Sequence, residues 1–222
     1  MGSFIKNELE PFSYLIYLFA IFFEYKREKS VLKGVLLAFY FFSFLSLSYA
    51  CKIALDENDN NNWIYNIHYI VSSIVFGYFF FRVLSDRNLR LLSMLLFGFT
   101  FLVLVITSYF IQKTVFNSYG SALLFIVIVL SCFLFLRQKF KSVNEEPLFL
   151  RFDMWLVSGY LLYFLGAFLV ILMYRYYTNK LPPEKQYLLA DIWAVQNVLL
   201  FVSSLLVLIG FLWGSFRKKQ LL

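Results

Sequence analysis

The side chains of this sequence that could do chemistry gather in two short stretches bordered by apolar residues. In the first stretch, residues 63–73, Tyr65, His68 and Ser72 lie three or four residues apart, so they share one face if the segment is helical. Asn66 adds an amide within the same turn. An imidazole titrates near neutral pH, so His68, the only histidine of the chain, could bind a ligand or act as a proton-linked switch.

The second stretch begins at Asp191 and supplies groups that bind mainly by hydrogen bonding. Trp193 and Asn197 lie four residues apart on one helical face, and Gln196 lies beside them. Asp191 and, on the preceding apolar segment, Arg175 are charged residues that flank this stretch. Together the two stretches predict a ligand-binding pocket with Asp191 and Arg175 at its mouth.

The same residues allow one structural interpretation, and they argue against two kinds of cofactor site. The polar side chains could form hydrogen bonds between helices and only hold the bundle together. A metal site needs several ligands at one place, and one histidine without a nearby cysteine does not supply them, so neither a metal nor another cofactor is expected. A retinal pigment needs a lysine in the last apolar segment, and there is none between Lys185 and Lys218.

The composition indicates which elements position these residues. The chain has 222 residues, of which 61% are hydrophobic and 15% charged, whereas soluble domains are about 45–50% apolar and about 25% charged. It contains 29 Phe and 16 Tyr residues, which is more aromatic surface than a soluble protein of this length could keep out of water. We therefore expect an integral membrane protein.

The spacing of charged residues predicts where the chain crosses the membrane, because roughly 20 apolar residues span the hydrocarbon core and charges at its centre are costly. Five intervals between charged residues contain 21 to 25 uncharged residues, and a sixth contains 18. The first apolar run has only 13, between Glu10 and Glu24. It crosses the bilayer only if both glutamates lie at the interfaces; a re-entrant or interfacial helix is the alternative.

We therefore predict an all-α membrane protein that forms a single transmembrane domain over residues 1–222. Seven spans are expected, at about residues 9–25, 32–53, 62–84, 91–112, 115–136, 153–175 and 188–214. On the two sets of flanks that alternate along such a bundle, one set holds 14 basic residues and the other six. The positive-inside rule then places the N-terminus outside and the C-terminus in the cytoplasm, and the net charge of +7 needs no nucleic-acid partner.

This orientation places the predicted pocket in the outer half of the bundle. At about 1.5 Å of rise per residue, His68 and the pair Gln196 and Asn197 lie at matching depths, roughly 8–13 Å below the outer boundary. The pocket forms if the third and seventh spans are neighbours. The inner halves of the spans consist almost wholly of Leu, Ile, Val and Phe.

Two segments carry a family resemblance: Asn61-Asn62-Trp63-Ile64-Tyr65-Asn66-Ile67-His68 at the start of the third span, and the stretch from Trp193 to Asn197 in the seventh. In these segments the chain resembles a group of small, uncharacterised seven-helix inner-membrane proteins of the Bacteroidota. The resemblance would cover most of the chain. It implies a multi-pass protein of the bacterial inner (cytoplasmic) membrane, and it implies no activity and no catalytic residue.

Three functions fit the sequence, and the short loops between the spans confine all of them to the bundle, its lipid face or a partner. The first is a receptor-like or accessory subunit, surrounded by membrane lipid, whose basic inner loops contact another membrane or cytoplasmic protein. The second is a small transporter or proton-coupled carrier, which predicts polar residues near the midplane or on both sides. The third is a membrane-embedded lipid-modifying enzyme with His68 or Asp191 as general base, and the sequence favours a non-enzyme over it.

Overall fold

The structure is a computed structural model of the chain, and it describes residues 5, 8–56, 61–111, 116–141, 151–178, 180, 182 and 187–220. Within these residues the chain is helical and contains no strand. Its elements are α2 (Leu9–Arg27), α3 (Val31–Asp56), α4 (Asn62–Val83), α5 (Arg87–Ile106), the π-helical turn η1 (Thr107–Ile111), α6 (Ser118–Lys141), α7 (Phe152–Thr178) and α8 (Tyr187–Gln220).

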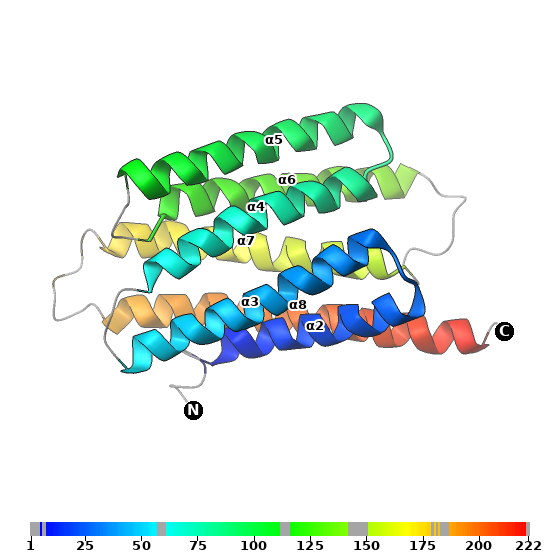
Figure 1. Cartoon of the computed structure of the whole chain (residues 1–222), viewed down its shortest axis with the longest axis horizontal. Coiled ribbons are helices and arrows are strands. Elements are labelled where there is room, and N and C mark those ends of the chain that lie inside the picture. The colour runs from blue at the N-terminus through cyan, green and yellow to red at the C-terminus, as the bar shows by residue number, and fades with distance from the viewer. Residues whose placement is uncertain are drawn as a thin grey trace.

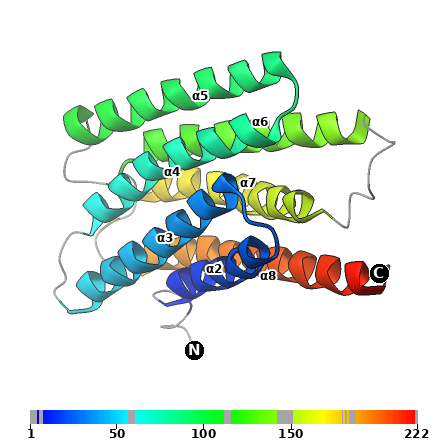
Figure 2. The same ribbon diagram turned by 45° about the vertical axis from the view of Figure 1, so that its right-hand side comes forward.

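Six of these helices form a closed ring. Backbone contacts join α2 to α3, α3 to α4, α4 to α6, α6 to α7, α7 to α8, and α8 back to α2. Helix α5 lies outside the ring, where it packs against α4 and α6, and Figures 1 and 2 both show it at the edge of the bundle. Helices α4 and α8 are therefore not neighbours along the ring, and only side chains that reach into its centre bring them together.

Successive helices run in opposite directions, so the basic residues gather at one end of the bundle. The hairpins between α2 and α3 and between α4 and α5 lie at this end, together with the C-terminal end of α8 (Figure 1). We call it the basic end. The basic residues of this end whose side chains the structure describes are Lys26, Arg27, Lys29, Lys33, Arg82, Arg87, Arg90, Arg137, Lys139, Lys141 and Arg151.

Six helical segments among the described residues are long and apolar enough to cross a membrane: Val31–Ala54, Asn62–Val83, Arg87–Ile111, Ser118–Lys141, Phe152–Thr178 and Leu188–Gly214. Their outward faces carry many exposed large apolar side chains, which a bilayer solvates and water does not. The prediction of an all-helical, multi-pass membrane protein is confirmed for the described part of the chain.

Helix α2 is the one described α-helix that is not among these six segments. Its two faces differ in polarity. Its outward face is apolar and consists of Phe12, Leu15, Phe19, Phe22 and Phe23, all exposed. Its inward face carries Glu10 and Glu24, which are only 4% and 1% exposed. Both side chains lie inside the protein, where side chains of other helices and of α2 itself contact them, and this burial is compatible with the interfacial depth that a full crossing by α2 requires.

Short polar contacts fix the helix ends that frame the interior. The Asp86 carboxylate accepts hydrogen bonds from the backbone N–H groups of Asn88 and Leu89, at 2.8 and 3.0 Å, and so caps α5. At the other end of α5, the Asn117 side-chain amide donates to Thr107 Oγ1 at 2.7 Å and to Ser108 Oγ at 2.8 Å. These bonds tie the π-helical turn to the start of α6.

A close approach of backbones closes the ring between α7 and α8. A Cβ atom at Gly159 would lie 2.7 Å from Val207 Cγ2 and 3.1 Å from Ser203 Oγ, so only glycine fits there. Ser203 Oγ uses this proximity and donates to the Gly159 carbonyl at 2.6 Å. The Tyr17 hydroxyl of α2 shares a hydrogen bond with the same Ser203 hydroxyl, which joins three helices at one point.

Candidate functional site

A pocket opens at the end of the bundle opposite the basic end, and we call it the Trp193 pocket. It has a volume of about 260 Å³ and is lined by Asn61, Asn62, Tyr65, Phe116, Tyr174, Leu189, Ala190 and Trp193. These residues come from the start of α4, the turn before α6, the end of α7 and the start of α8. Two residues singled out from the sequence, Tyr65 and Trp193, are therefore brought together although α4 and α8 are not neighbours.

Four aromatic rings form the walls of the Trp193 pocket. The Trp193 ring lies 5.4 Å from Tyr65, 5.3 Å from Phe116 and 5.5 Å from Tyr174 between centroids, with interplanar angles of 82°, 89° and 68°. Phe116 also lies 6.0 Å from Tyr174 at 78°. Rings at these distances and angles pack edge to face, and each such pair is favourable.

The buried carboxyl group of Glu10 contacts two of these four rings without lining the pocket. Tyr65 Oη donates a hydrogen bond to Glu10 Oε2 at 3.0 Å, and the Trp193 indole lies within hydrogen-bonding reach of the same carboxyl. The indole N–H is a donor only, so two walls of the pocket point their donors at one acceptor. Among the described residues, no basic side chain pairs with Glu10.

Glu10 is the functional candidate that the sequence reasoning missed. A signal for it was present: Glu10, Tyr14, Tyr17 and Glu24 repeat at spacings of four, three and seven residues, which places them on one face of a helix. The opposite face is wholly aromatic and aliphatic. A glutamate in such a polar stripe belongs to the interior of a bundle rather than to its rim.

His68 and Ser72 lie deeper, at the centre of the ring. Ser43 Oγ donates to the Phe39 carbonyl at 2.9 Å, so its remaining capacity is to accept, and His68 Nε2 donates to it at 3.0 Å. The imidazole stacks on Phe39, 5.8 Å between centroids. Ser72 Oγ bonds back to the His68 carbonyl at 2.7 Å. His68 therefore faces α3 rather than the start of α8.

Gln196 belongs to the same central region. Its side-chain amide donates to Tyr163 Oη at 3.2 Å, and within the described residues its buried Oε1 atom has no hydrogen-bond partner. Together with His68 and Ser72 it borders a central cluster of hydroxyl groups, in which Tyr40 Oη donates to Tyr160 Oη at 2.8 Å. A cavity of about 20 Å³ lies in this cluster, room for about one water molecule.

The remaining predicted residues hold the structure or lie outside the Trp193 pocket. Asn66 Oδ1 accepts from the Asn117 backbone N–H at 3.0 Å, and Asn197 Nδ2 donates to the Ile5 carbonyl at 3.1 Å. Arg175 contacts Tyr119 of α6, both by a hydrogen bond of 3.2 Å and by its guanidinium over the ring at 4.8 Å. Asp191 is exposed and does not line the pocket.

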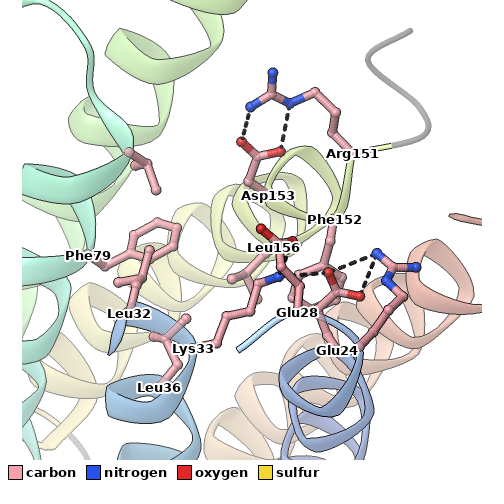
Figure 3. A pocket seen from close by; sticks show the side chains of 12 residues that line it. Glu24, Glu28, Leu32, Lys33, Leu36, Phe79, Arg151, Phe152, Asp153 and Leu156 are labelled. Atoms are coloured by element: carbon pink, nitrogen blue, oxygen red, sulfur yellow. Dashed lines mark hydrogen bonds and ion pairs between the residues drawn. The ribbon is translucent and has the colours of Figure 1, made fainter. Parts of the chain in front are cut away.

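A second pocket opens at the basic end, and we call it the Glu24 pocket (Figure 3). It has a volume of about 520 Å³ and is lined by Glu24, Arg27, Glu28, Leu32, Lys33, Leu36, Phe79, Val83, Arg151, Phe152, Asp153 and Leu156. These residues come from α2, α3, α4 and α7 and the residues beside them. This pocket was not predicted from the sequence, because its polar residues lie near the ends of apolar segments.

Ion pairs line the Glu24 pocket. The buried Glu24 carboxylate pairs with Arg27 at 2.7 Å and with Lys33 at 3.0 Å, and Lys33 also reaches the exposed Glu28 at 2.7 Å. Across the pocket, Arg151 pairs with Asp153 at 2.8 Å, as the paired dashed lines in Figure 3 show. Glu24 therefore differs from Glu10, because its charge is compensated by two cations.

The two pockets place aromatic rings at one end of the ring of helices and paired charges at the other. In the described part of the chain, no group of three or more His, Cys, Asp and Glu side chains is placed to hold a metal ion. The ring of helices has one pocket at each end. Packed aromatic side chains separate the two pockets, and hydroxyl groups of these side chains hydrogen-bond to one another. Comparison of the chain with protein-family models, curated proteins and solved structures finds no match.

Proposed function

We propose that this chain is a receptor-like or accessory membrane subunit that binds a small ligand in the Trp193 pocket and acts through a partner protein at its basic end. The observation that carries the proposal is the pocket itself, about 260 Å³ in volume and walled by aromatic rings, two of which contact the buried Glu10. Ligand sites combine apolar walls with a few placed polar groups in this way.

The proposal includes the orientation and the location of the protein. The basic end faces the cytoplasm under the positive-inside rule, so the Trp193 pocket faces outward from a bacterial inner membrane. Helix α2 is the seventh span: its 19 residues correspond to about 28 Å at 1.5 Å per residue. Its outward face is wholly apolar, and the burial of Glu10 and Glu24 keeps both charges away from lipid.

A connected interior supports communication between the two ends. Beneath Glu10, α2 carries Tyr17, which bonds to Ser203 of α8, and the same helix ends in the ion pairs of Glu24. A ligand that shifts the start of α2 against α8 is therefore coupled to the residues that a partner protein meets at the basic end. The partner is another membrane or cytoplasmic protein with an acidic contact surface.

Photo-crosslinking in cells tests this proposal. A photoreactive amino acid replaces Lys29 or Arg87, which are exposed at the basic end, and we expect one discrete crosslinked product. Trp193→Ala should change the yield of that product, whereas Trp63→Ala should not, because Trp63 is 51% exposed and outside the pocket. If the product is absent, or if its yield is the same in both variants, the proposal fails.

A second candidate function, a small carrier, is favoured by one observation. The two pockets lie at opposite ends of the same ring, and polar groups such as Tyr40, Tyr160 and His68 lie between them. Carriers expose a central site to one side at a time. With cysteines at Ala190 and Leu32, one in each pocket, a carrier predicts that a bulky thiol reagent on one cysteine protects the other. Independent reactivity of the two positions excludes alternating access.

A further inference from the structure

The Trp193 pocket combines two features that together select a class of ligand. Its walls are the rings of Tyr65, Phe116, Tyr174 and Trp193. The negative π-faces of aromatic rings attract cations, and boxes of such rings bind quaternary ammonium groups. The volume of about 260 Å³ lies just below the range of about 300–1,000 Å³ that holds drug-sized molecules, so the occupant is small.

The second feature is the carboxyl group of Glu10, which is 4% exposed. It accepts a hydrogen bond from Tyr65 and lies within reach of the Trp193 indole N–H. The Tyr65 hydroxyl and the Trp193 N–H thus both point to an acidic group. Donation of a hydrogen bond to a carboxylate raises the electron density of the donor's ring and strengthens the attraction of that ring for a cation. Among the described residues, no Lys or Arg lines the pocket or pairs with Glu10.

A neutral ligand does not account for this arrangement as well. A sugar or a peptide amide needs several polar partners on the pocket walls, but the polar side chains that line the pocket are Asn61, Asn62 and the Tyr65 and Tyr174 hydroxyls. Of these, Asn61 Nδ2 already donates to the Ala50 carbonyl at 3.1 Å, and the Tyr65 hydroxyl to Glu10 at 3.0 Å. An anion is opposed by the Glu10 carboxyl group, which contacts Tyr65 and Trp193 of the pocket wall.

We propose that the Trp193 pocket binds a small organic cation, namely a quaternary or fully alkylated ammonium group, with the four rings as its walls and Glu10 as the acidic group that contacts two of them. This inference rests on the proposed function and names its ligand class. The same chemistry occurs in a free solute and in the headgroup of phosphatidylcholine, so the experiment has an arm for each source.

Isothermal titration of the full chain in nanodiscs of phosphatidylglycerol tests the inference. The probes are choline and its neutral carbon isostere, 3,3-dimethyl-1-butanol. We expect choline to bind at least about tenfold more tightly than the isostere, a difference of about 1.4 kcal/mol. Equal affinity for the two probes, or no binding of choline, overturns the inference. A headgroup as the natural ligand predicts that phosphatidylcholine in the nanodisc abolishes binding of free choline; a free solute predicts that it does not.

Variants locate the site. Tyr174 lines the pocket without contacting Glu10, so Tyr174→Leu should weaken choline binding about tenfold, and Tyr174→Phe, which keeps the ring, should restore it. Glu10→Gln should weaken choline at least as much and leave the isostere unchanged. Trp63→Leu is the matched control. If Glu10→Gln does not fold, the two Tyr174 variants still decide the question; unchanged choline binding in Tyr174→Leu overturns the inference.

The outcomes separate this inference from the proposed function. Loss of choline binding together with an intact, Trp193-dependent crosslink at the basic end refutes only the ligand class. If the Tyr174 and Glu10 variants weaken choline binding as expected, but Trp193→Ala does not change the crosslink yield, only the receptor-like function is refuted and the cation site is supported.

Discussion

The two buried glutamates of α2 illustrate how different partners give the same residue type different roles. Glu24 is compensated by Arg27 and Lys33, so it holds the end of α2 against the start of α3. Glu10 has donors from Tyr65 and Trp193 but no described cation beside it. A buried ion pair is expensive to break because the remaining charge is left without a partner, whereas a carboxyl group held only by neutral donors is free to attract a cationic ligand.

The Glu24 ion pairs carry a prediction at the residue scale. Glu24→Gln leaves Lys33 and Arg27 without their buried partner and should lower the free energy of unfolding by about 2–4 kcal/mol. Glu28→Gln removes a pair to the same Lys33, but the Glu28 side chain is 72% exposed, so its loss should cost less than about 0.5 kcal/mol. Unfolding by SDS in mixed micelles measures both values. Equal effects of the two substitutions would show that burial of Glu24 does not matter.

At the scale of helices, the packing of α7 on α8 depends on glycine. Gly159 has no room for a Cβ atom, since Val207 Cγ2 and Ser203 Oγ lie at 2.7 and 3.1 Å from its position. Gly98 of α5 has nothing within 4 Å of the same atom and faces outward. The same substitution should therefore have opposite effects at the two positions.

We expect Gly159→Ala to destabilise the protein by about 1–3 kcal/mol, because α8 must move away and the bond from Ser203 to the Gly159 carbonyl weakens. We expect Gly98→Ala to stabilise it by about 0.5–1 kcal/mol, because alanine favours the helical backbone. The same SDS titration reports both. A loss of stability at Gly98, or none at Gly159, contradicts the packing described for α5, α7 and α8.

The crossing of the membrane by α2 is a second prediction at this scale. Glu8 and Lys29 flank the helix, and both are exposed. In a background with Cys51→Ser and Cys132→Ala, a cysteine at Glu8 should react with a membrane-impermeant maleimide added to spheroplasts. A cysteine at Lys29 should react only in inverted vesicles. Reaction of both positions from one side would make α2 a re-entrant helix, and reaction of both only in inverted vesicles would place the N-terminus in the cytoplasm.

For the whole molecule, some properties follow from the sequence and others do not. Charge spacing predicts the helical segments and their alternation, because the bilayer penalises charge wherever a helix crosses it. Neighbour relations do not follow, because a helix that is apolar on all sides has no hydrophobic periodicity to mark its inner face. For this reason the matching depths of His68 and Asn197 predicted one shared pocket, whereas the His68 ring bonds to Ser43 of α3. Glu10 was recognisable only from the polar stripe that it shares with Tyr14 and Tyr17.

The last prediction concerns the ring as a whole, which encloses a packed centre rather than a channel. Tyr40 and Tyr160 meet at 2.8 Å between their hydroxyl oxygens, and Tyr17 stacks on Tyr40 at 4.7 Å. This packing lies between the Trp193 pocket and the Glu24 pocket, and its cavity holds about one water molecule. A continuous file of water, which protons need in order to cross, is therefore interrupted at the centre.

Proteoliposomes that contain the wild-type chain should hold a pH gradient as long as empty liposomes do, as followed by an enclosed pH-sensitive dye. Tyr40→Ala combined with Tyr160→Ala removes both side chains of the central contact, so water from the two pockets can meet and the gradient should decay faster. Tyr49→Ala combined with Tyr176→Ala, two exposed tyrosines, is the matched control and should not leak. A wild-type chain that dissipates the gradient by itself would mean that the centre is open to protons, and it would favour the carrier over the receptor-like subunit.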